Sequence, residues 1–362
     1  MAGFEFTKYV TYEDTGSIIA IRGLNCKNGS LDLRDVKYID NSDFSKLSRS
    51  KLYVGDILYT YVGTVGEVAV VDKNDKYYLA PNVSRIRLSK DYNSDFIKQL
   101  LGSKKFYNKI VFPLIATSSQ PALSMENLRR FKLRVPSIKE QKKIASLFNA
   151  IDERIATQNK IIEDLKKLKC AIIDKVYSEI QGKEYSYGQL FDVVNERNKQ
   201  MEYSNILSAS QEKGMVNRDD LNLDIQFERS NINIYKIVKK GDYVIHLRSF
   251  QGGFAFSDKL GVCSPAYTIL RPDSLLEYGY LSNYFTSQRF IKSLVLVTYG
   301  IRDGRSINVD EWLRMKITIP PKEHQQYIVK VIGTFERKIE DEEAYAAQLS
   351  IQKQYLLRQM FV

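Results

Sequence analysis

The sequence predicts an α+β protein with two mainly β domains, each followed by a long helix, and with the two helices paired as an antiparallel coiled coil. Three observations lead to this fold class: an internal repeat, short β-type segments in each copy, and a proline followed by a long helical segment in each copy. The repeat sets residues 123–155 beside 307–339 without a gap, at a constant repeat offset (307 − 123 = 184). With so large an offset, the repeated unit is a domain plus an arm rather than a solenoid module.

The clearest part of the repeat is an apolar strand, a proline and the start of a helix. The first copy reads KLRVPSIKEQKKIASLFNAIDERI at 132–155, and the second reads KITIPPKEHQQYIVKVIGTFERKI at 316–339. These motifs predict a first domain at 1–136, a first helical region at 137–182, a second domain at 183–320 and a second helical region at 321–362.

Each domain opens with short β-type runs that are punctuated by glycine. In the first domain they are SIIAIRG at 17–23 and KLYVGDILYTYVGTVGEVAVV at 51–71, and in the second KIVKKGDYVIHLRSFQGGFAFS at 236–257. Such runs predict a small, mainly antiparallel and strongly twisted sheet with a helix or two. Asp56 and Asp242 each follow a glycine and precede an apolar strand, a pattern that is usually a turn.

Long helices account for the rest of each copy. After Pro136 the chain has no proline or glycine until Gly182, which indicates one continuous helix. Its seam recurs at intervals of 4 and 3 residues from Ile151 to Val176, and the second copy matches it from Phe335 to Met360. This is the heptad rule of a coiled coil, in a helix about 50 Å long at ~1.5 Å per residue. The alternative is two unrelated amphipathic helices, each packed on its own domain.

Polar residues within the seam predict a register for this pairing. Antiparallel helices related by a pseudo-twofold axis would set Lys169 opposite Glu342 and Gln158 opposite Lys353. Polar seam positions cost stability, but they penalise slipped and parallel pairings.

The composition favours a polyanionic partner. The chain has 362 residues, a formal net charge of +11 and a pI near 9.2, a signature that ribosomal and membrane-surface proteins share. Its three cysteines are too few and too scattered for a disulfide framework or a zinc site. No apolar run approaches the roughly 20 residues of a membrane span, and the N-terminus lacks the core of a signal peptide. We therefore expect a cytoplasmic protein that faces nucleic acid.

Two loops in each copy carry polar groups, beside glycine in the earlier loop of each copy, that suit contacts with phosphates and base edges. They are 61–66 and 116–124 in the first copy, and 248–253 and 299–307 in the second. The later loop of each copy occupies the same repeat position with almost no shared residues, so we expect specificity to differ there. The candidate DNA-binding residues are Arg22, Lys27, Tyr59, Tyr61, Thr64, Ser118, Ser119, Gln120, Arg248, Ser249, Gln251, Tyr299, Arg302 and Arg305.

Side-chain chemistry suggests particular roles for three of these residues. Arg302 and Arg305 could each contact guanine through two hydrogen bonds, and Gln120 could read adenine. For any one of them, an ordinary turn or a surface Arg-Asp pair is the competing interpretation.

The sequence contains no recognisable catalytic motif. It lacks a phosphate loop of the Gly-x-x-x-x-Gly-Lys-Ser/Thr type, a strand-linked Gly-x-Gly-x-x-Gly and a His-Glu-x-x-His pair. The two histidines, His246 and His324, have no cysteine or carboxylate constellation that recurs in both copies, and His324 stands where the first copy has Glu140. We therefore predict no catalytic residue and no metal ligand, and interpret the chain as a non-enzymatic reader of sequence.

The duplicated strand-proline-helix motif, the Gly-Asp-Ile-Leu strand followed by Gly-Thr-Val-Gly, and the two-copy layout together resemble the specificity subunit of type I restriction-modification systems over nearly the whole chain. The resemblance implies two target recognition domains that each bind one half of a split DNA sequence. It implies paired helices that fix the spacer and dock two methyltransferase subunits, which two restriction subunits can join. S-adenosylmethionine would then belong to the partner methyltransferase, and this chain would bind no cofactor.

The sequence departs from this family pattern in two places, which concern the packing of the first domain and the surface that binds the partner subunits. The second copy has an entry segment at 185–200 that the first copy lacks, and His324 replaces the glutamate of the motif. Two other functions stay open: a coiled-coil scaffold whose repeats bind protein, and an unrecognised nuclease or methyltransferase. A scaffold would lack a steep salt dependence on duplex DNA, whereas an enzyme would show activity that depends on metal or S-adenosylmethionine.

Overall fold

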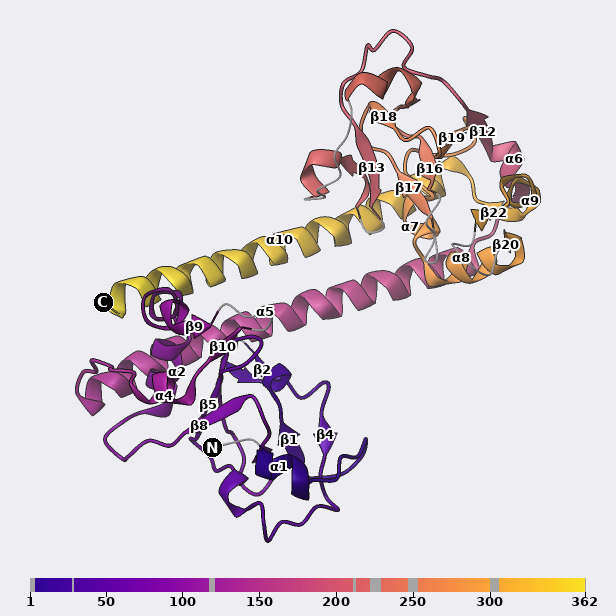
Figure 1. Ribbon diagram of the computed structural model, residues 1–362. Helices are drawn as coiled ribbons and strands as arrows, with labels where there is room; N and C mark the ends of the chain where they lie inside the picture. The colour runs from indigo at the N-terminus through magenta and orange to yellow at the C-terminus, as the bar shows by residue number, and fades with distance from the viewer. Residues whose placement is uncertain are drawn as a thin grey trace. The chain divides into compact units, whose positions relative to one another are not determined.

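The computed structural model describes residues 4–27, 29–116, 121–210, 213–221, 229–246, 253–299 and 306–361 (Figure 1). The chain forms two compact units: unit 1 is Met1–Asn159 with Ala344–Val362, and unit 2 is Lys160–Glu343. Each unit therefore contains one β-rich domain, part of the helix that follows it, and part of the helix that follows the other domain.

The first domain and its helix contain these elements in chain order: α1 (Phe4–Tyr9), β1 (Ile19–Ile21), β2 (Cys26–Lys27), β3 (Ser30–Leu31), β4 (Lys37–Tyr38), β5 (Ile57–Thr60), β6 (Val68–Val70), β7 (Tyr77–Leu79), β8 (Val83–Ile86), α2 (Ser94–Leu101), α3 (Lys104–Phe106), β9 (Ile115–Ala116), β10 (Ala122–Leu123), α4 (Met125–Arg129) and α5 (Ile138–Glu179).

The second domain and its helix contain β11 (Lys183–Ser186), α6 (Tyr187–Leu190), β12 (Phe191–Val194), β13 (Leu207–Ser210), β14 (Gly214–Asn217), β15 (Lys236–Val238), β16 (Tyr243–Ile245), β17 (Phe254–Phe256), β18 (Gly261–Cys263), β19 (Thr268–Pro272), α7 (Ser282–Phe285), α8 (Gln288–Ser293), β20 (Thr298–Tyr299), β21 (Ser306–Ile307), α9 (Val309–Arg314), β22 (Lys316–Ile319) and α10 (Lys322–Met360).

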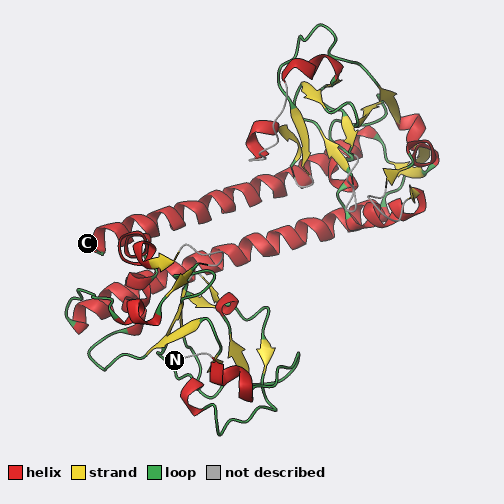
Figure 2. Ribbon diagram, in the orientation of Figure 1, coloured by secondary structure: helices red, strands yellow, loops and turns green. Residues whose placement is uncertain are grey.

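The first domain is built on two three-stranded sheets, ordered β6-β5-β8 and β4-β1-β7 (Figure 2). All pairs in the first sheet are antiparallel, whereas β1 pairs with β7 in parallel. Strand β5 is buried at all four positions. Ile57 and Tyr59 pack toward α2 and the helix pair, and Leu58 packs toward β1 and β7. The central strand therefore has a core on both of its faces.

The second domain is built on one four-stranded antiparallel sheet, ordered β12-β19-β16-β17. Its core is aromatic: the fully buried Trp312 of α9 stacks on Tyr187 with ring centroids 4.2 Å apart and planes 12° apart. Phe254 and Phe285 complete this cluster with centroids 5.0 and 6.0 Å from the Trp312 ring. The predicted class of two β-rich domains, each followed by a long helix, is confirmed.

Both Gly-Asp pairs form the predicted turns, and each is fixed by an ion pair between a buried carboxylate and a partly exposed arginine. In the first domain, the Asp56 carboxylate is 2% exposed and accepts hydrogen bonds from Arg87 at 2.7 and 2.6 Å. In the second, Asp242 is 2% exposed and accepts hydrogen bonds from Arg271 at 3.0 and 3.1 Å. The glycine before each aspartate has a positive φ, 87° for Gly55, which a residue with a Cβ adopts only with strain.

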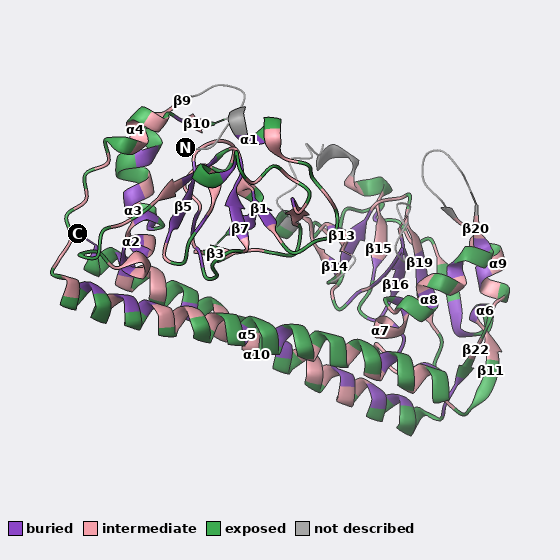
Figure 3. Cartoon of the chain, turned by 90° about the horizontal axis from the view of Figure 1, so that it is seen from below, coloured by how far each residue is buried: buried purple, intermediate pink, exposed green. Residues whose placement is uncertain are grey.

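Helices α5 and α10 pair with each other in antiparallel fashion, as predicted. In unit 1, Lys353 of α10 lies 2.5 Å from the Asp152 carboxylate of α5. In unit 2, Lys169 of α5 lies 3.1 Å from the Glu336 carboxylate of α10. These ion pairs are the same contact in the two copies, because 353 − 169 and 336 − 152 both equal 184. Figure 3 shows buried and half-buried residues recurring along one side of each helix and exposed residues along the other.

The predicted register is wrong. Lys169 bonds Glu336 rather than Glu342, and Lys353 bonds Asp152 rather than Gln158. Both partners lie six positions nearer the start of their helix than predicted (342 − 336 and 158 − 152). A seam with a seven-residue period looks almost the same after a shift of about one heptad, so the pattern alone does not select the register. Polar contacts with the domains do: Lys169 also donates to Asn283 at 3.3 Å.

In unit 1, the corresponding ion pair between Lys353 and Asp152 is also contacted by a side chain of the domain. The Gln99 amide of α2 donates to Asp152 at 2.8 Å, and Gln99 corresponds to Asn283 at the repeat offset (283 − 99 = 184). Each domain therefore reaches the helix pair through one amide at the interhelical ion pair.

The repeated proline and glutamine of the motif join each long helix to its domain. In the second copy, the Gln325 side chain is 1% exposed, donates to the carbonyls of Pro320 and Leu275 at 3.0 Å each, and accepts the Glu277 amide at 2.7 Å. In the first copy, Gln141 donates to the Pro136 carbonyl and accepts the Asn93 amide, both at 2.9 Å. The glutamine thus satisfies backbone groups at the point where the helix leaves the domain.

We expect Gln325→Leu to lower the free energy of unfolding by about 2–3 kcal/mol, because it leaves up to three backbone groups without a partner. Gln141→Leu should cost less, since that side chain makes two such bonds. The neighbouring exposed Gln326 offers a matched control, and Gln326→Leu should stay within about 0.5 kcal/mol. Urea unfolding followed by circular dichroism measures all three variants. Equal losses for Gln325 and Gln326 would contradict this role.

Each domain also holds the end of the helix that follows the other domain. Phe361, just after α10, is 7% exposed and packs against Phe96 of the first domain, with centroids 5.2 Å apart. Tyr177 at the end of α5 packs against Tyr280 of the second domain at 5.5 Å. The pairs correspond at the repeat offset, since 361 − 177 and 280 − 96 both equal 184. We call these contacts the helix-end clamps.

Candidate nucleic-acid interface

Three segments of the first domain meet at the end of strand β5: the loop 61–66, the segment 107–114 and the hairpin of β9 and β10. The Gly63 amide donates to the Pro121 carbonyl at 3.0 Å, and the Leu123 amide donates to the Tyr61 carbonyl at 2.8 Å. The two loops that the sequence predicts to face DNA therefore lie side by side in this domain.

Gly66 allows the third segment to close on this site. A Cβ atom built at Gly66 would lie 2.7 Å from the Tyr107 ring, and the Gly66 φ is 100°. Any larger side chain would push Tyr107 away and strain the backbone. The glycine therefore serves the packing of the loop, in addition to turning the chain.

Two of the predicted DNA-binding residues lie in this loop with different exposure. Thr64 is exposed, and its carbonyl accepts a hydrogen bond from the buried Thr60 hydroxyl. Tyr61 is half-buried and packs against the domain core. Thr60 holds the loop in shape while Thr64 faces outward.

The prediction for Tyr59 is wrong. Its side chain has no exposed surface, and its hydroxyl has no hydrogen-bond partner among the residues that the structure describes. Burial raises the pKa of Tyr59 above its ordinary value, with a smaller contribution from Tyr107. The ring packs edge-on against Phe131 at 6.1 Å, so Tyr59 is a core residue that cannot contact DNA.

Arg22 and Lys27 lie outside the loop cluster. The Arg22 guanidinium donates to the Asp35 carbonyl and carboxylate at 3.1 and 3.0 Å, which partly neutralises its charge. Lys27 on β2 is exposed and is the freer cation of the two.

Most of the other predicted contacts lie outside the described residues. These are Ser118, Ser119, Gln120, Arg248, Ser249, Gln251, Arg302 and Arg305. The backbone of Tyr299 belongs to β20, and its side chain is outside the description.

The second domain has its hairpin in the same place. Strand β20 pairs with β21, and the Asn308 amide donates to the Val297 carbonyl at 2.9 Å. At the end of β16, the His246 amide donates to the Gly253 carbonyl at 2.8 Å. Burial lowers the pKa of His246 below its ordinary value, which keeps its imidazole neutral at pH 7. His246 therefore adds no charge that would attract phosphate.

Sequence reasoning missed the side chains of segment 107–114 and of its counterpart 294–297. Both segments combine exposed apolar residues with nearby cations, of which Lys104, Lys109 and Lys292 are exposed. The sequence does contain an apolar run without regular spacing before each hairpin. Such a run could have indicated an exposed surface, but it is equally typical of residues buried in the core.

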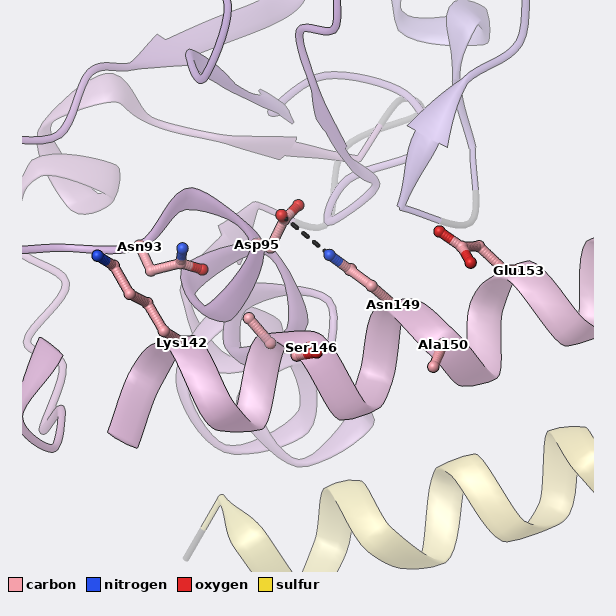
Figure 4. Close-up of a pocket in the computed structure, with 8 residues that line it drawn as sticks. Asn93, Asp95, Lys142, Ser146, Asn149, Ala150 and Glu153 are labelled. Carbon is pink, nitrogen blue, oxygen red and sulfur yellow. Dashed lines mark hydrogen bonds between the residues drawn. The ribbon is translucent and has the colours of Figure 1, made fainter. Parts of the chain in front are cut away.

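A hollow in the surface lies on the first domain beside α5 (Figure 4). It has a volume of about 400 Å³ and is lined by polar groups that include Asp95, Lys142 and Glu153. The Asn149 amide donates across its floor to Asp95 at 3.0 Å. None of the lining residues is aromatic, and we assign no ligand to it.

Within the described ranges, no three histidine, cysteine or carboxylate residues form a group that could hold a metal ion. No described helix combines the length and apolarity that a membrane crossing needs.

Comparisons with known proteins agree with this architecture. Residues 11–167 and 182–350 each match the model of the type I restriction modification DNA specificity domain. A protein of Methanocaldococcus jannaschii, described as a putative type I restriction enzyme MjaX specificity subunit, is 22% identical over 343 residues, covering 86% of this chain and 79% of its own length. The type I restriction enzyme EcoKI specificity subunit of Escherichia coli K12 is 24% identical over 168 residues, covering 43% of this chain and 36% of its own.

Solved structures show the same fold. The S subunit of a type I restriction-modification system from M. genitalium superposes with a TM-score of 0.55 at 14% identity, covering 99% of this chain and 91% of that one. A chain from a study of complex assembly and conformational transition of the type I R-M system gives a TM-score of 0.59 at 15% identity, covering 98% and 92%.

Proposed function

Since the chain belongs to the family of type I restriction modification DNA specificity domains and is the DNA specificity subunit of such a system, we propose that each of its two domains reads one half of a bipartite target. The paired helices α5 and α10 would set the spacer between the halves. As the specificity subunit, the chain is the non-catalytic component of its system.

The observation that carries this proposal is the contrast between a duplicated scaffold and unlike loops. The ion pair of the Gly-Asp turn, the glutamine joint and the interhelical ion pair all recur between the copies, at the repeat offset or within two positions of it. The hairpin loops differ, with ATSSQPALS at 116–124 and YGIRDGRSI at 299–307 sharing little beyond length. A duplicated scaffold that carries different hairpin loops suits two domains that recognise different DNA sequences.

The partners in this proposal are duplex DNA and two methyltransferase subunits, a core that two restriction subunits can join. Exposed lysine and arginine side chains would bind phosphates, while the loop tips would contact base edges. S-adenosylmethionine and the catalytic groups would belong to the methyltransferase, and this chain would bind no cofactor. The complex would act in the cytoplasm, where its DNA is.

The outer face of α10 offers a docking surface for a methyltransferase. Ile351 and Tyr355 lie one turn apart on α10 and are 69% and 59% exposed. Exposed apolar side chains at a spacing of four residues suit the face of a partner helix. This surface would serve equally in a protein scaffold without DNA, and the salt dependence of DNA binding distinguishes the two functions.

We expect the double variant Arg302→Ala with Arg305→Ala to relax one half of the methylated motif and leave the other half intact. Each lost bidentate contact with guanine removes about 1–3 kcal/mol of discrimination. The measurement maps adenine methylation on random-sequence DNA by the chain in complex with its methyltransferase. The Gln120→Ala variant is the matched test of the first domain and should relax the opposite half.

Two outcomes would contradict the proposal. Relaxation of both halves by the double variant would show that the domains do not read separately. A wild-type complex that yields no split motif and binds duplex DNA without salt dependence would favour the protein scaffold.

A further inference from the structure

Each domain exposes a short apolar turn immediately before its β-hairpin. Phe112 in the first domain is 64% exposed, and Leu296 in the second is 74% exposed. We call residues 110–114 and 294–297 the apolar turns. Exposed large apolar side chains that are grouped in this way mark an interaction surface.

The two apolar turns occupy one position of the repeat. Phe112 and Leu296 are separated by the repeat offset (296 − 112 = 184). A buried valine lies next to each of them at a different repeat position, since Val111, which precedes Phe112, is 0% exposed and Val297, which follows Leu296, is 4% exposed. A feature that recurs in both copies, while the hairpin tips differ, serves a task that the two domains share.

The surroundings of the turns are cationic. Lys104 and Lys109 are exposed on either side of the first turn's helical lead-in, and Arg289 and Lys292 are exposed before the second turn. The apolar groove of a protein partner does not need this density of positive charge, whereas a phosphate backbone does. Charge complementarity therefore favours duplex DNA as the occupant.

The first turn is also continuous with the loop that faces DNA in the proposed function. Phe112 packs against Tyr107 with ring centroids 6.4 Å apart, and Tyr107 lies against Gly66 of the loop 61–66. An aromatic side chain that is supported from behind and exposed at its tip has the form of a rigid wedge.

We propose that the apolar turns are DNA wedges, which insert Phe112 and Leu296 against the bases of the two half-sites and unstack a base step in each. This inference rests on the proposed function, because it takes the domains to bind duplex DNA. Phenylalanine, leucine, isoleucine and proline are the residues that proteins insert between base steps, next to basic groups that hold the phosphates. The wedge would help any base pair beside it to open, whatever its sequence.

The Phe112→Trp variant reports insertion directly. The chain has a single tryptophan, Trp312, which is fully buried in the second domain, so the new indole at the exposed turn can be followed apart from it. We expect its red-shifted emission, measured as the difference between the variant and wild-type complexes with the methyltransferase, to be strongly quenched on titration with duplex DNA that carries the methylated motif. Emission that DNA leaves unchanged would overturn the proposal.

Affinity and its salt dependence provide a second test. Phe112→Ala and Leu296→Ala should each weaken DNA binding about 10-fold, as expected for loss of one stacked side chain. Neither variant should alter the slope of affinity against NaCl concentration, because neither removes a cation. Lys109→Ala should reduce that slope. Val54→Ala is the matched control, since Val54 is 55% exposed at the opposite end of β5 and should leave DNA binding unchanged.

The outcomes separate this inference from the function on which it rests. Suppose that the DNA affinity of the wild-type complex depends steeply on salt concentration, and that Phe112→Ala and Leu296→Ala bind DNA as tightly as the wild type. The wedge is then overturned and the proposed function stands. If these variants instead lose the methyltransferase on co-purification, the apolar turns are protein-docking surfaces and the wedge is again overturned. Absence of salt-dependent binding by the wild type would overturn both proposals.

Discussion

The Trp312→Ala variant is expected to lower the free energy of unfolding of unit 2 by about 3–5 kcal/mol, the range for removing a buried aromatic side chain. Trp312 has no exposed surface and lies at the centre of an aromatic cluster. Its ring is stacked on Tyr187 and has Phe254 within 5.0 Å. The side chains around it come from strands and from short helices, so they cannot all move inward to fill the space that alanine leaves.

Urea unfolding by far-ultraviolet circular dichroism measures this loss, because the variant has no tryptophan left to fluoresce. Tyr327→Ala is the control, since Tyr327 is an aromatic residue of the same unit that is 68% exposed. It should cost less than about 0.5 kcal/mol. Similar midpoints for the two variants would show that the cluster is not the centre of stability of unit 2.

The Asp242→Ala variant should lower the free energy of unfolding by about 2–3 kcal/mol, because it removes the buried acceptor of three hydrogen bonds and leaves Arg271 with Glu196 as its carboxylate partner. Asp242 accepts two hydrogen bonds from Arg271 and one from the Lys239 amide at 2.8 Å. These bonds hold the pKa of Arg271 above its ordinary value, with Glu196 as a further partner. An arginine side chain stays charged in proteins even without such bonds, so Arg271 remains a cation when its carboxylate partner is removed. The Lys239 amide would lose its acceptor as well.

Two further variants make the ion-pair prediction specific. Asp242→Asn keeps the shape and one acceptor oxygen but removes the charge, and should cost about half as much. Asp192→Ala removes an exposed carboxylate from the same sheet and should have little effect. If Asp242→Asn is as stable as wild type in thermal unfolding, the charge of Asp242 does not matter to the turn and the prediction fails.

The fold could be predicted from the repeat and from the heptad period of the helices. An offset that stays constant through a strand, a proline and a helix requires two copies of one structure, and a heptad seam requires a partner helix. The interhelical register could not be predicted in the same way. Residues such as Asn283 and Gln99, which belong to the domains, contact Lys169 and Asp152, and no local pattern announces these contacts.

The candidate site was predicted less well, and Tyr59 shows why. A strand that leads into a candidate DNA-binding loop, in a small antiparallel sheet, suggests one buried face and one exposed face. Strand β5 instead has cores on both faces, so every side chain in it is buried. Contacts between loops leave no periodic pattern in the sequence. The grouping of 61–66 with the hairpin depends on backbone hydrogen bonds such as that from the Gly63 amide to the Pro121 carbonyl. The sequence could indicate the loops but not their neighbours.

The helix-end clamps bear on how the chain is made by the ribosome. Unit 1 needs Phe361 and the last part of α10 against Phe96 and Phe148. Phe361 follows the whole second domain in the chain, and synthesis runs from the N-terminus. The first domain therefore waits through synthesis of the whole second domain with an apolar surface uncovered, whereas Tyr177 is already at hand when Tyr280 is made. The domain that leaves the ribosome first is the last to be completed, and it is the one that nascent-chain chaperones would hold longest.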